Sequence, residues 1–277
     1  MKRTCLVLLG LAVLLFCGCS YKSYFEVTKG EFEIMEVEHF NGAGKCVPQQ
    51  TSLKGFSVSA SYANDKYIPM DVSNKKQVLS DTVAVPNSKF DFDYERPNTL
   101  LISGEGSFMY KGDIALSGIS LGVTSLPLFY IRASVGANMR NGEGGLFAYY
   151  ALGETHANFS GYWYHPTTYD MGFTSHAYKE QYESDRYARD ISTAGLGGYG
   201  SVYAGPVALS SSVSLSTPWR DRSEDLDLTF DFPYLIRAYV GASVWMGDHV
   251  KVSAGVSDYV NAEKLRLSFG GSVGYWL

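Results

Sequence analysis

The sequence is poor in charge, in cysteine and in long apolar runs. Lys, Arg, Asp and Glu make up 18% of its 277 residues, below the roughly 25% that is usual in soluble globular domains. Its 23 basic residues are outnumbered by 28 acidic ones, which argues against the basic surface expected of a nucleic-acid-binding protein. Four cysteines in the whole chain are too few for a disulfide-rich scaffold.

The longest apolar run lies at the N-terminus and is too short for a transmembrane helix. Lys2 and Arg3 precede 13 mostly apolar residues, 5–17, whereas a membrane-spanning helix needs about 20. A positive start, a short apolar core and small residues after it are typical of a signal peptide. Because no second long apolar run follows, a mature chain that crosses a membrane must cross it as strands.

The end of this segment resembles a bacterial lipobox. It reads Phe16-Cys17-Gly18-Cys19-Ser20, with a small residue directly before Cys19, and it departs from the usual pattern at Phe16, where a lipobox normally carries Leu. The resemblance implies a signal peptide over residues 1–18 and a lipid on Cys19. Ordinary signal cleavage nearby is the alternative. Cys46 would then be a lone thiol, so no structural disulfide is expected.

Glycine, serine and aromatic residues are abundant, and from about residue 53 apolar and polar side chains alternate with period two. Such alternation indicates strands with two different faces. The expected strands are residues 54–63, 99–110, 113–123, 128–139, 146–164, 193–204, 207–216, 234–246, 249–258 and about 264–277. Most have 10–14 residues, and a tilted strand needs about 9–11 to cross a bilayer. The sequence therefore predicts an all-β chain, an antiparallel up-and-down transmembrane β-barrel of about ten strands, within a range of eight to twelve.

Tight and long connections alternate between these strands. The tight ones carry turn residues, at 111–113, 141–144, 205–206 and 247–248, and the long ones cover about 64–98, 165–192 and 217–232. Outer-membrane barrels have short periplasmic turns and long external loops, so both ends of the barrel are expected in the periplasm. The predicted domains are a signal peptide (1–18), an N-terminal periplasmic tether or plug (19–50) and the barrel (51–277).

The polar faces of the strands are mostly Ser, Gly, Tyr and Thr with few charges. A soluble barrel would show many Lys and Glu on its outer face, so the apolar face is predicted to face lipid. The last strand resembles the C-terminal signature of outer-membrane barrels at Phe269, Val273 and Tyr275, and departs from it by ending in Trp276-Leu277. This resemblance implies the outer membrane of a Gram-negative-type bacterium, lipids as partners, and a barrel-insertion machinery that engages the last strand.

Six charged residues fall on predicted inward faces, and a barrel of about ten strands is narrow enough for side chains to fill it. They are Glu105, Arg132, Arg237, Lys251, Lys264 and Arg266. We expect them to form a packed, ion-paired lumen, because unpaired interior charges are costly. The alternative is an ion-selective constriction in a narrow pore.

The region 149–190 is rich in aromatic residues, which suit either a membrane-interface girdle or an external surface that binds a ligand or partner. The candidates for surface binding are Tyr162, Trp163, Tyr164, Tyr169 and Tyr178. Its histidines match no metal-ligand spacing, so no metal site and no cofactor are expected.

An enzymatic alternative rests on acidic pairs in the loops. Ten-stranded outer-membrane proteases pair an Asp-x-Asp with an Asp-x-His; here Asp91 and Asp93 form the former, and Glu154-Thr155-His156 is the nearest analogue of the latter. Because no positioned general base can be identified, no catalytic residue is assigned. The leading prediction is a non-enzymatic outer-membrane barrel lipoprotein in envelope structure or surface interaction. A barrel hydrolase and a soluble barrel that binds an apolar ligand are the alternatives.

Overall fold

The computed structural model describes residues 24–33, 37, 39, 40, 42, 51–63, 67–73, 76–78, 100–125, 128–166, 177–218, 229–231, 234–260 and 267–277. Those residues form strands and turns, and no helix among them is long and apolar enough to cross a membrane.

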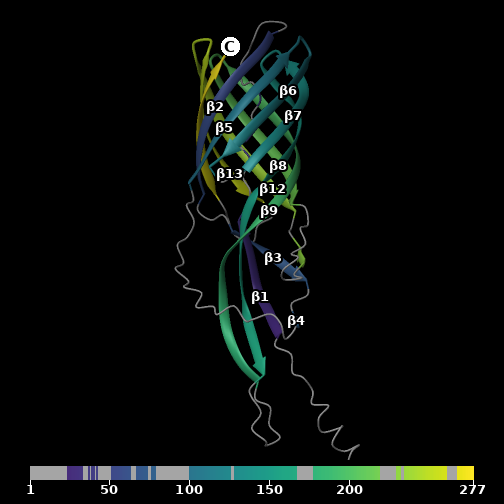
Figure 1. Ribbon diagram of the computed structural model, residues 1–277. Helices are drawn as coiled ribbons and strands as arrows, with labels where there is room; N and C mark the ends of the chain where they lie inside the picture. The colour runs from purple at the N-terminus through teal and green to yellow at the C-terminus, as the bar shows by residue number, and fades with distance from the viewer. Residues whose placement is uncertain are drawn as a thin grey trace, which may run out of the picture.

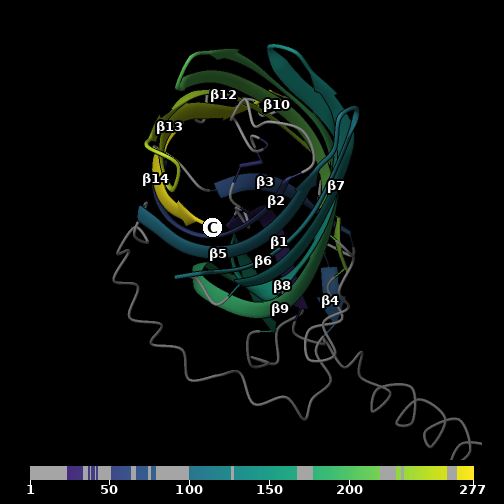
Figure 2. The same ribbon diagram turned by 90° about the horizontal axis from the view of Figure 1, so that it is seen from above.

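Ten of the described strands form a closed antiparallel barrel (Figures 1 and 2). Each pairs with the next around the ring, and β14 returns to β2. The barrel strands are β2 (Thr51–Ala63), β5 (Leu100–Lys111), β6 (Ala115–Thr124), β7 (Leu128–Met139), β8 (Gly142–Pro166), β9 (Ala177–Ala204), β10 (Val207–Pro218), β12 (Leu235–Met246), β13 (Val250–Tyr259) and β14 (Ser268–Trp276). The predicted architecture and strand number are confirmed.

The two rims of the barrel differ as the connections predicted. Short turns join β5 to β6, β7 to β8, β9 to β10 and β12 to β13 at one end, which we call the short-turn rim. Gly205 and Gly247 adopt φ of 63° and 68° in two of these turns, a conformation that glycine accepts without steric cost. Both Thr51, where β2 begins, and Leu277 lie at this rim. We call the opposite end the long-loop rim.

The seam between the first and last barrel strands is fully hydrogen-bonded. β14 pairs with β2 from Trp276–Gly55 to Ser268–Ala63, and Lys54 and Leu277 exchange two backbone hydrogen bonds of 3.1 and 2.7 Å. Gly55 lies under the Trp276 indole, where any Cβ would overlap the ring. The ring therefore has no open edge, as a sheet in lipid requires.

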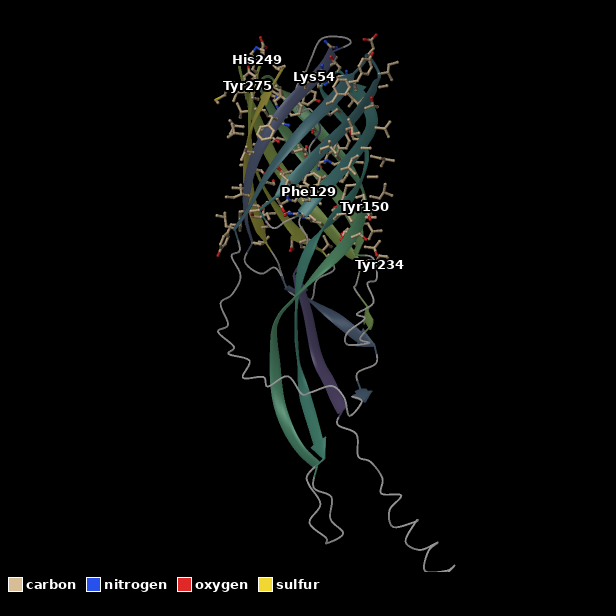
Figure 3. The ribbon with its side chains drawn as sticks, in the orientation of Figure 1. Lys54, Phe129, Tyr150, Tyr234, His249 and Tyr275 are labelled. Atoms are coloured by element: carbon tan, nitrogen blue, oxygen red, sulfur yellow. The ribbon has the colours of Figure 1, made fainter. Side chains whose placement is uncertain are left out.

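Apolar side chains point out of the barrel and small or polar ones point in (Figure 3). On β12, Val240 is 62% exposed, whereas Arg237 is 8% exposed. Exposed aromatic residues lie near both rims, with Phe129, Tyr150 and Tyr234 towards one end and Tyr275 towards the other. A 12-residue strand tilted by about 40° spans roughly 30 Å, which matches an apolar belt between two aromatic girdles. The alternative of a soluble barrel with an apolar interior is wrong.

This inside–outside assignment predicts a depth-dependent cost for a charge on the outer face. Val240→Arg, in the middle of β12, is expected to destabilise the folded barrel by about 2–4 kcal/mol, and Met246→Arg, at the short-turn rim, by about 0–1 kcal/mol. Both side chains are exposed on the same strand, so the second is a matched control. Urea unfolding in lipid vesicles measures both, and equal costs would contradict a lipid-facing belt.

Beyond the long-loop rim, strands form in three stretches for which the sequence predicted loops, and in residues 24–33, whose structure it left open. Leu128 pairs with Gly153 at this rim, and β8 and β9 continue past it as a ribbon that ends at Pro166–Ala177. β1 (Tyr24–Glu33) pairs with β8, β3 (Tyr67–Ser73) and β4 (Lys76–Val78) pair with β1, and β11 (Thr229–Asp231) pairs with β3. We call these strands, with β8 after residue 153 and β9 before residue 191, the distal sheet.

The loop prediction was wrong for β3, β4, β11 and residues 177–190 because they lack the period-two signal. Residues 177–190 mix charged and aromatic side chains on both faces, as suits a ribbon outside the lipid. Backbone pairing continues through this ribbon, with one register shift between Ala157 and Phe159. The ribbon is thus held by ladder hydrogen bonds, which leave no alternating pattern in the sequence.

Candidate functional site

The lumen of the barrel is occupied by a segment of the chain itself. Val37, His39, Phe40 and Gly42, the described residues between β1 and β2, all contact side chains on the inner face of the barrel. We call residues 37–42 the lumen segment. Val37 and Phe40 are 7% and 6% exposed, so they pack as core residues.

The lumen segment runs from the long-loop rim towards the short-turn rim. Val37 packs with Leu128, Tyr130 and Ala151, near the pairing of Leu128 with Gly153 at the long-loop rim. Gly42 accepts a hydrogen bond from Lys251, next to the β12–β13 turn at the other rim. From Val37 to Gly42, the lumen segment thus crosses much of the barrel interior.

Phe40 occupies an aromatic seat in the middle of the lumen. Its ring meets Tyr199 edge-on with centroids 4.7 Å apart, and Phe147 at 5.5 Å. The Arg132 guanidinium lies 4.8 Å from the centre of the Phe40 ring, a cation–π contact that gains strength away from water. The seat joins three barrel strands, β7, β8 and β9, to one side chain of the lumen segment.

Behind Phe40, a buried acid–base cluster joins β5 to β7. The Glu105 carboxylate accepts hydrogen bonds from Tyr130 Oη at 2.7 Å and from Ser107 Oγ at 2.8 Å. Arg132 Nη2 forms an ion pair with the same carboxylate. Because both charges are buried and hydrogen-bonded, each compensates the desolvation of the other.

A second cluster holds the segment near the short-turn rim. Lys111 Nζ lies 3.5 Å from Glu143 Oε2 and donates to Tyr203 Oη at 3.3 Å, and Lys251 Nζ donates to the Gly42 carbonyl at 3.2 Å. Gly42 has a φ of 64°, and a Cβ there would overlap the Glu143 carboxylate. This position therefore requires glycine, both for its backbone conformation and for its close approach to the barrel wall.

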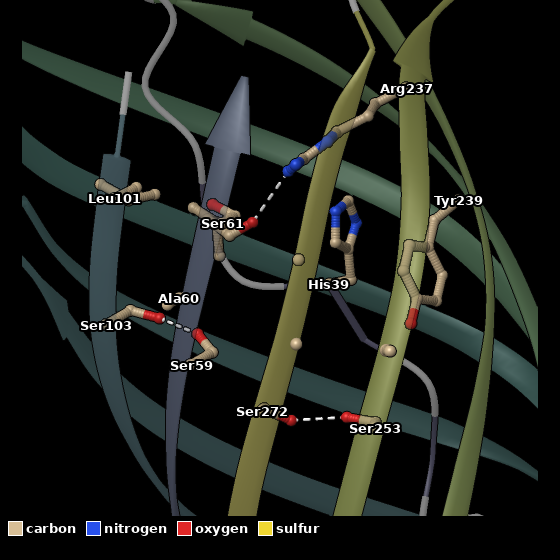
Figure 4. A pocket seen from close by; sticks show the side chains of 14 residues that line it. His39, Ser59, Ala60, Ser61, Leu101, Ser103, Arg237, Tyr239, Ser253 and Ser272 are labelled. Atoms are coloured by element: carbon tan, nitrogen blue, oxygen red, sulfur yellow. Dashed lines mark hydrogen bonds between the residues drawn. The ribbon is translucent and has the colours of Figure 1, made fainter. Parts of the chain in front are cut away.

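Arg237 holds the other end of the lumen segment. Its Nη1 donates to the Val37 carbonyl at 3.0 Å, and its Nε and Nη2 donate to Ser257 Oγ. His39 stacks on Tyr239 with ring centroids 4.2 Å apart. Figure 4 shows the His39 ring between Arg237 and Tyr239, beside a serine-lined cavity of about 50 Å³. A second cavity, beside Phe40, measures about 20 Å³. Such spaces hold a few water molecules.

Four of the six charges that the sequence placed inside the barrel are buried there: Glu105, Arg132, Arg237 and Lys251. Lys264 and Arg266 lie outside the described residues. The sequence analysis missed Lys111 and Glu143, because it assigned both to turns. Continued alternation beyond Glu105 and Ser107 would have placed Lys111 on the inner face.

Four of the five aromatic candidates for surface binding lie on the distal sheet. Tyr162, Trp163 and Tyr164 of β8 pair with β1 on one side and β9 on the other, and Tyr178 of β9 pairs with His165. Tyr169 lies outside the described residues, as do Asp91 and Asp93 of the hydrolase alternative and Cys19. His156 pairs with Ala188 in the same ribbon. Among the residues that the structure describes, no three His, Cys, Asp or Glu side chains gather as a metal site would need.

No protein-family model matches the chain, and no curated protein matches it either. Solved structures with a similar arrangement include an outer membrane channel from Pseudomonas putida F1, at 10% identity and a TM-score of 0.33, over 86% of this chain and 99% of the other. They also include OmpT with a loop deletion, an outer membrane protein of Vibrio cholerae, at 9% identity and a TM-score of 0.28, over 83% of this chain and 99% of the other. The outer membrane protease OmpT from Escherichia coli is similar at 10% identity and a TM-score of 0.28, over 91% and 97%.

These identities and scores decide nothing about activity or substrate. The strand pairing and the apolar outer face of this chain are those of an outer-membrane β-barrel.

Proposed function

We propose that this chain is a closed outer-membrane barrel that neither conducts ions nor catalyses a reaction. Its role is in envelope structure or surface interaction, carried by the distal sheet outside the lipid. The observation that supports this most directly is the lumen segment, which fills the interior with Val37, Phe40 and their neighbours. A narrow pore would need a continuous wet path in its place.

The buried charges support closure rather than ion selectivity. Glu105 and Arg132 neutralise each other, as do Lys111 and Glu143. Arg237 and Lys251 donate to backbone carbonyls of the lumen segment. A selectivity filter presents like charges to passing ions, whereas these side chains bind one another and the segment.

The distal sheet is the part of the described chain that is free for an outside partner. β1, β3 and the ends of β8 and β9 stand clear of the barrel in Figure 1, and aromatic residues concentrate there in the sequence. Tyr and Trp give rigid contact area at low entropic cost. We therefore assign surface interaction to this sheet, and a scaffolding role to the barrel.

The test of closure is conductance in planar lipid bilayers. The wild-type protein is expected to show no steady channel current, and Gly42→Leu is expected to open one, because its side chain overlaps Glu143 and displaces the lumen segment. Gly106→Leu is the matched control: Gly106 is exposed on the outer face of β5, and a Cβ there meets nothing within 4 Å. A steady channel current from the wild-type protein, equal to that of Gly42→Leu, would overturn the proposal.

A further inference from the structure

The two ends of the lumen segment leave the barrel through opposite rims. β1 pairs with β8 from Phe32–Ala157 to Tyr24–Tyr164, entirely beyond Gly153 and the long-loop rim. After the lumen segment, β2 begins at Thr51, paired with Lys111 at the short-turn rim. β1 and β2 are consecutive strands in the sequence, yet the whole barrel lies between Phe32 and Thr51.

The contacts inside the barrel follow the same order. Val37 lies by Leu128 and Tyr130 near the long-loop rim, Phe40 by Phe147 and Tyr199 at mid-height, and Gly42 by Glu143 and Lys251 near the short-turn rim. Only four residues separate Phe32 from Val37, so the segment enters the lumen directly from the distal sheet. This monotonic order describes a passage through the lumen, because a loop that entered and left by the same rim would reverse it.

We infer that the chain is threaded through its own barrel, so that β1, and with it the predicted lipidation site at Cys19, emerges at the outer surface of the cell. The inference rests on the proposed function, in which the long-loop rim faces outwards as in other outer-membrane barrels. It places residues 24–33 on the opposite side of the barrel from the periplasmic position expected for the segment 19–50.

The length of chain between Cys19 and β1 limits where a lipid on Cys19 could lie. Cys19 precedes Tyr24 by five residues, which span at most about 18 Å when extended. Tyr24 pairs with Tyr164, eleven residues beyond Gly153, a rise of about 36 Å along β8. A lipid attached at Cys19 would therefore not reach back past the rim to the inner leaflet.

Cysteine labelling of intact cells tests the threading. In a Cys46→Ser background, Gly30→Cys and Glu31→Cys place a thiol on each face of β1, and a membrane-impermeant maleimide reports exposure before and after the outer membrane is permeabilised. Both positions pair with β3. At least one is expected to label as strongly in intact cells as in permeabilised ones. Labelling of both only after permeabilisation, or only after denaturation, would overturn the inference.

Two reporters on the barrel separate this failure from failure of the proposed function. Asp113→Cys lies in the short turn between β5 and β6, and Val260→Cys follows β13 at the long-loop rim. Val260→Cys is expected to label in intact cells, and Asp113→Cys only after permeabilisation. If these two behave as expected and β1 does not label, the threading is wrong and the barrel stands; if the two are reversed or alike, the orientation in the membrane is wrong.

Discussion

Glu105→Ala is expected to destabilise the folded barrel by about 3–5 kcal/mol, because it leaves the buried Arg132 guanidinium without its carboxylate. Arg132 is 2% exposed and is packed between Glu105 and the Phe40 ring, so water cannot replace the lost partner without a rearrangement of the lumen. Tyr130 and Ser107 lose their acceptor as well. Urea unfolding of the protein in lipid vesicles measures the loss.

Two companion variants separate charge from packing. Glu105→Gln keeps the size and one acceptor oxygen but not the charge, and is expected to fall between wild type and Glu105→Ala. The double variant Glu105→Ala/Arg132→Met removes both charges and is expected to recover much of the stability, since replacing a whole buried pair by apolar groups is often neutral. A double variant that is less stable than Glu105→Ala would show that the ion pair is not the reason for the cost.

Phe40→Ala is expected to cost about 3–5 kcal/mol, the range for truncation of a buried phenylalanine. The variant empties the seat between Tyr199, Phe147 and Arg132, which is one of two apolar contacts described between the lumen segment and the barrel wall. The loss is expected in two observables: a lower urea midpoint, and faster proteolysis within residues 34–50.

Phe40→Leu is the matched control, because a volume-conserving apolar exchange usually costs less than about 1.5 kcal/mol. It keeps an apolar side chain in the seat but removes the cation–π contact with Arg132. If Phe40→Ala is cleaved rapidly within residues 34–50 while the urea midpoint of the barrel is unchanged, the Phe40 side chain holds the lumen segment in place but does not stabilise the barrel. An effect of Phe40→Ala no larger than that of Phe40→Leu would mean that the seat does not hold the segment.

The barrel could be predicted because its environment imposes a two-sided pattern. Lipid outside and packed polar groups inside force residues such as Val240 and Arg237 to alternate, and the tight turns carry glycine where φ is positive. The same alternation placed Glu105, Arg132, Arg237 and Lys251 inside. It missed Lys111 and Glu143 only because they adjoin turns, where the pattern was not followed to the end of the strand.

The lumen segment and the distal sheet could not be predicted in the same way. Residues 26–40 mix Glu with Phe, Ile and Val, a composition compatible with a strand, a helix, a plug or a tether. What fixes the segment is contact with residues more than 90 positions away, such as Phe40 with Phe147 and Tyr199. Gly42 is required by its positive φ and by the Glu143 carboxylate beside it, and no local feature of the sequence predicts that close approach.

The fully bonded seam between β14 and β2 also sets the order of assembly. In a threaded chain, a filled ten-strand ring leaves no room for β1 to slide through, so the ring is expected to close around the lumen segment after the segment is laid down. The last ladder to form is then the one between Gly55 and Trp276, whose partners are separated by nearly the whole chain. Contacts between such distant residues form slowly. The expected assembly intermediate is therefore an open barrel with the lumen segment already inside it.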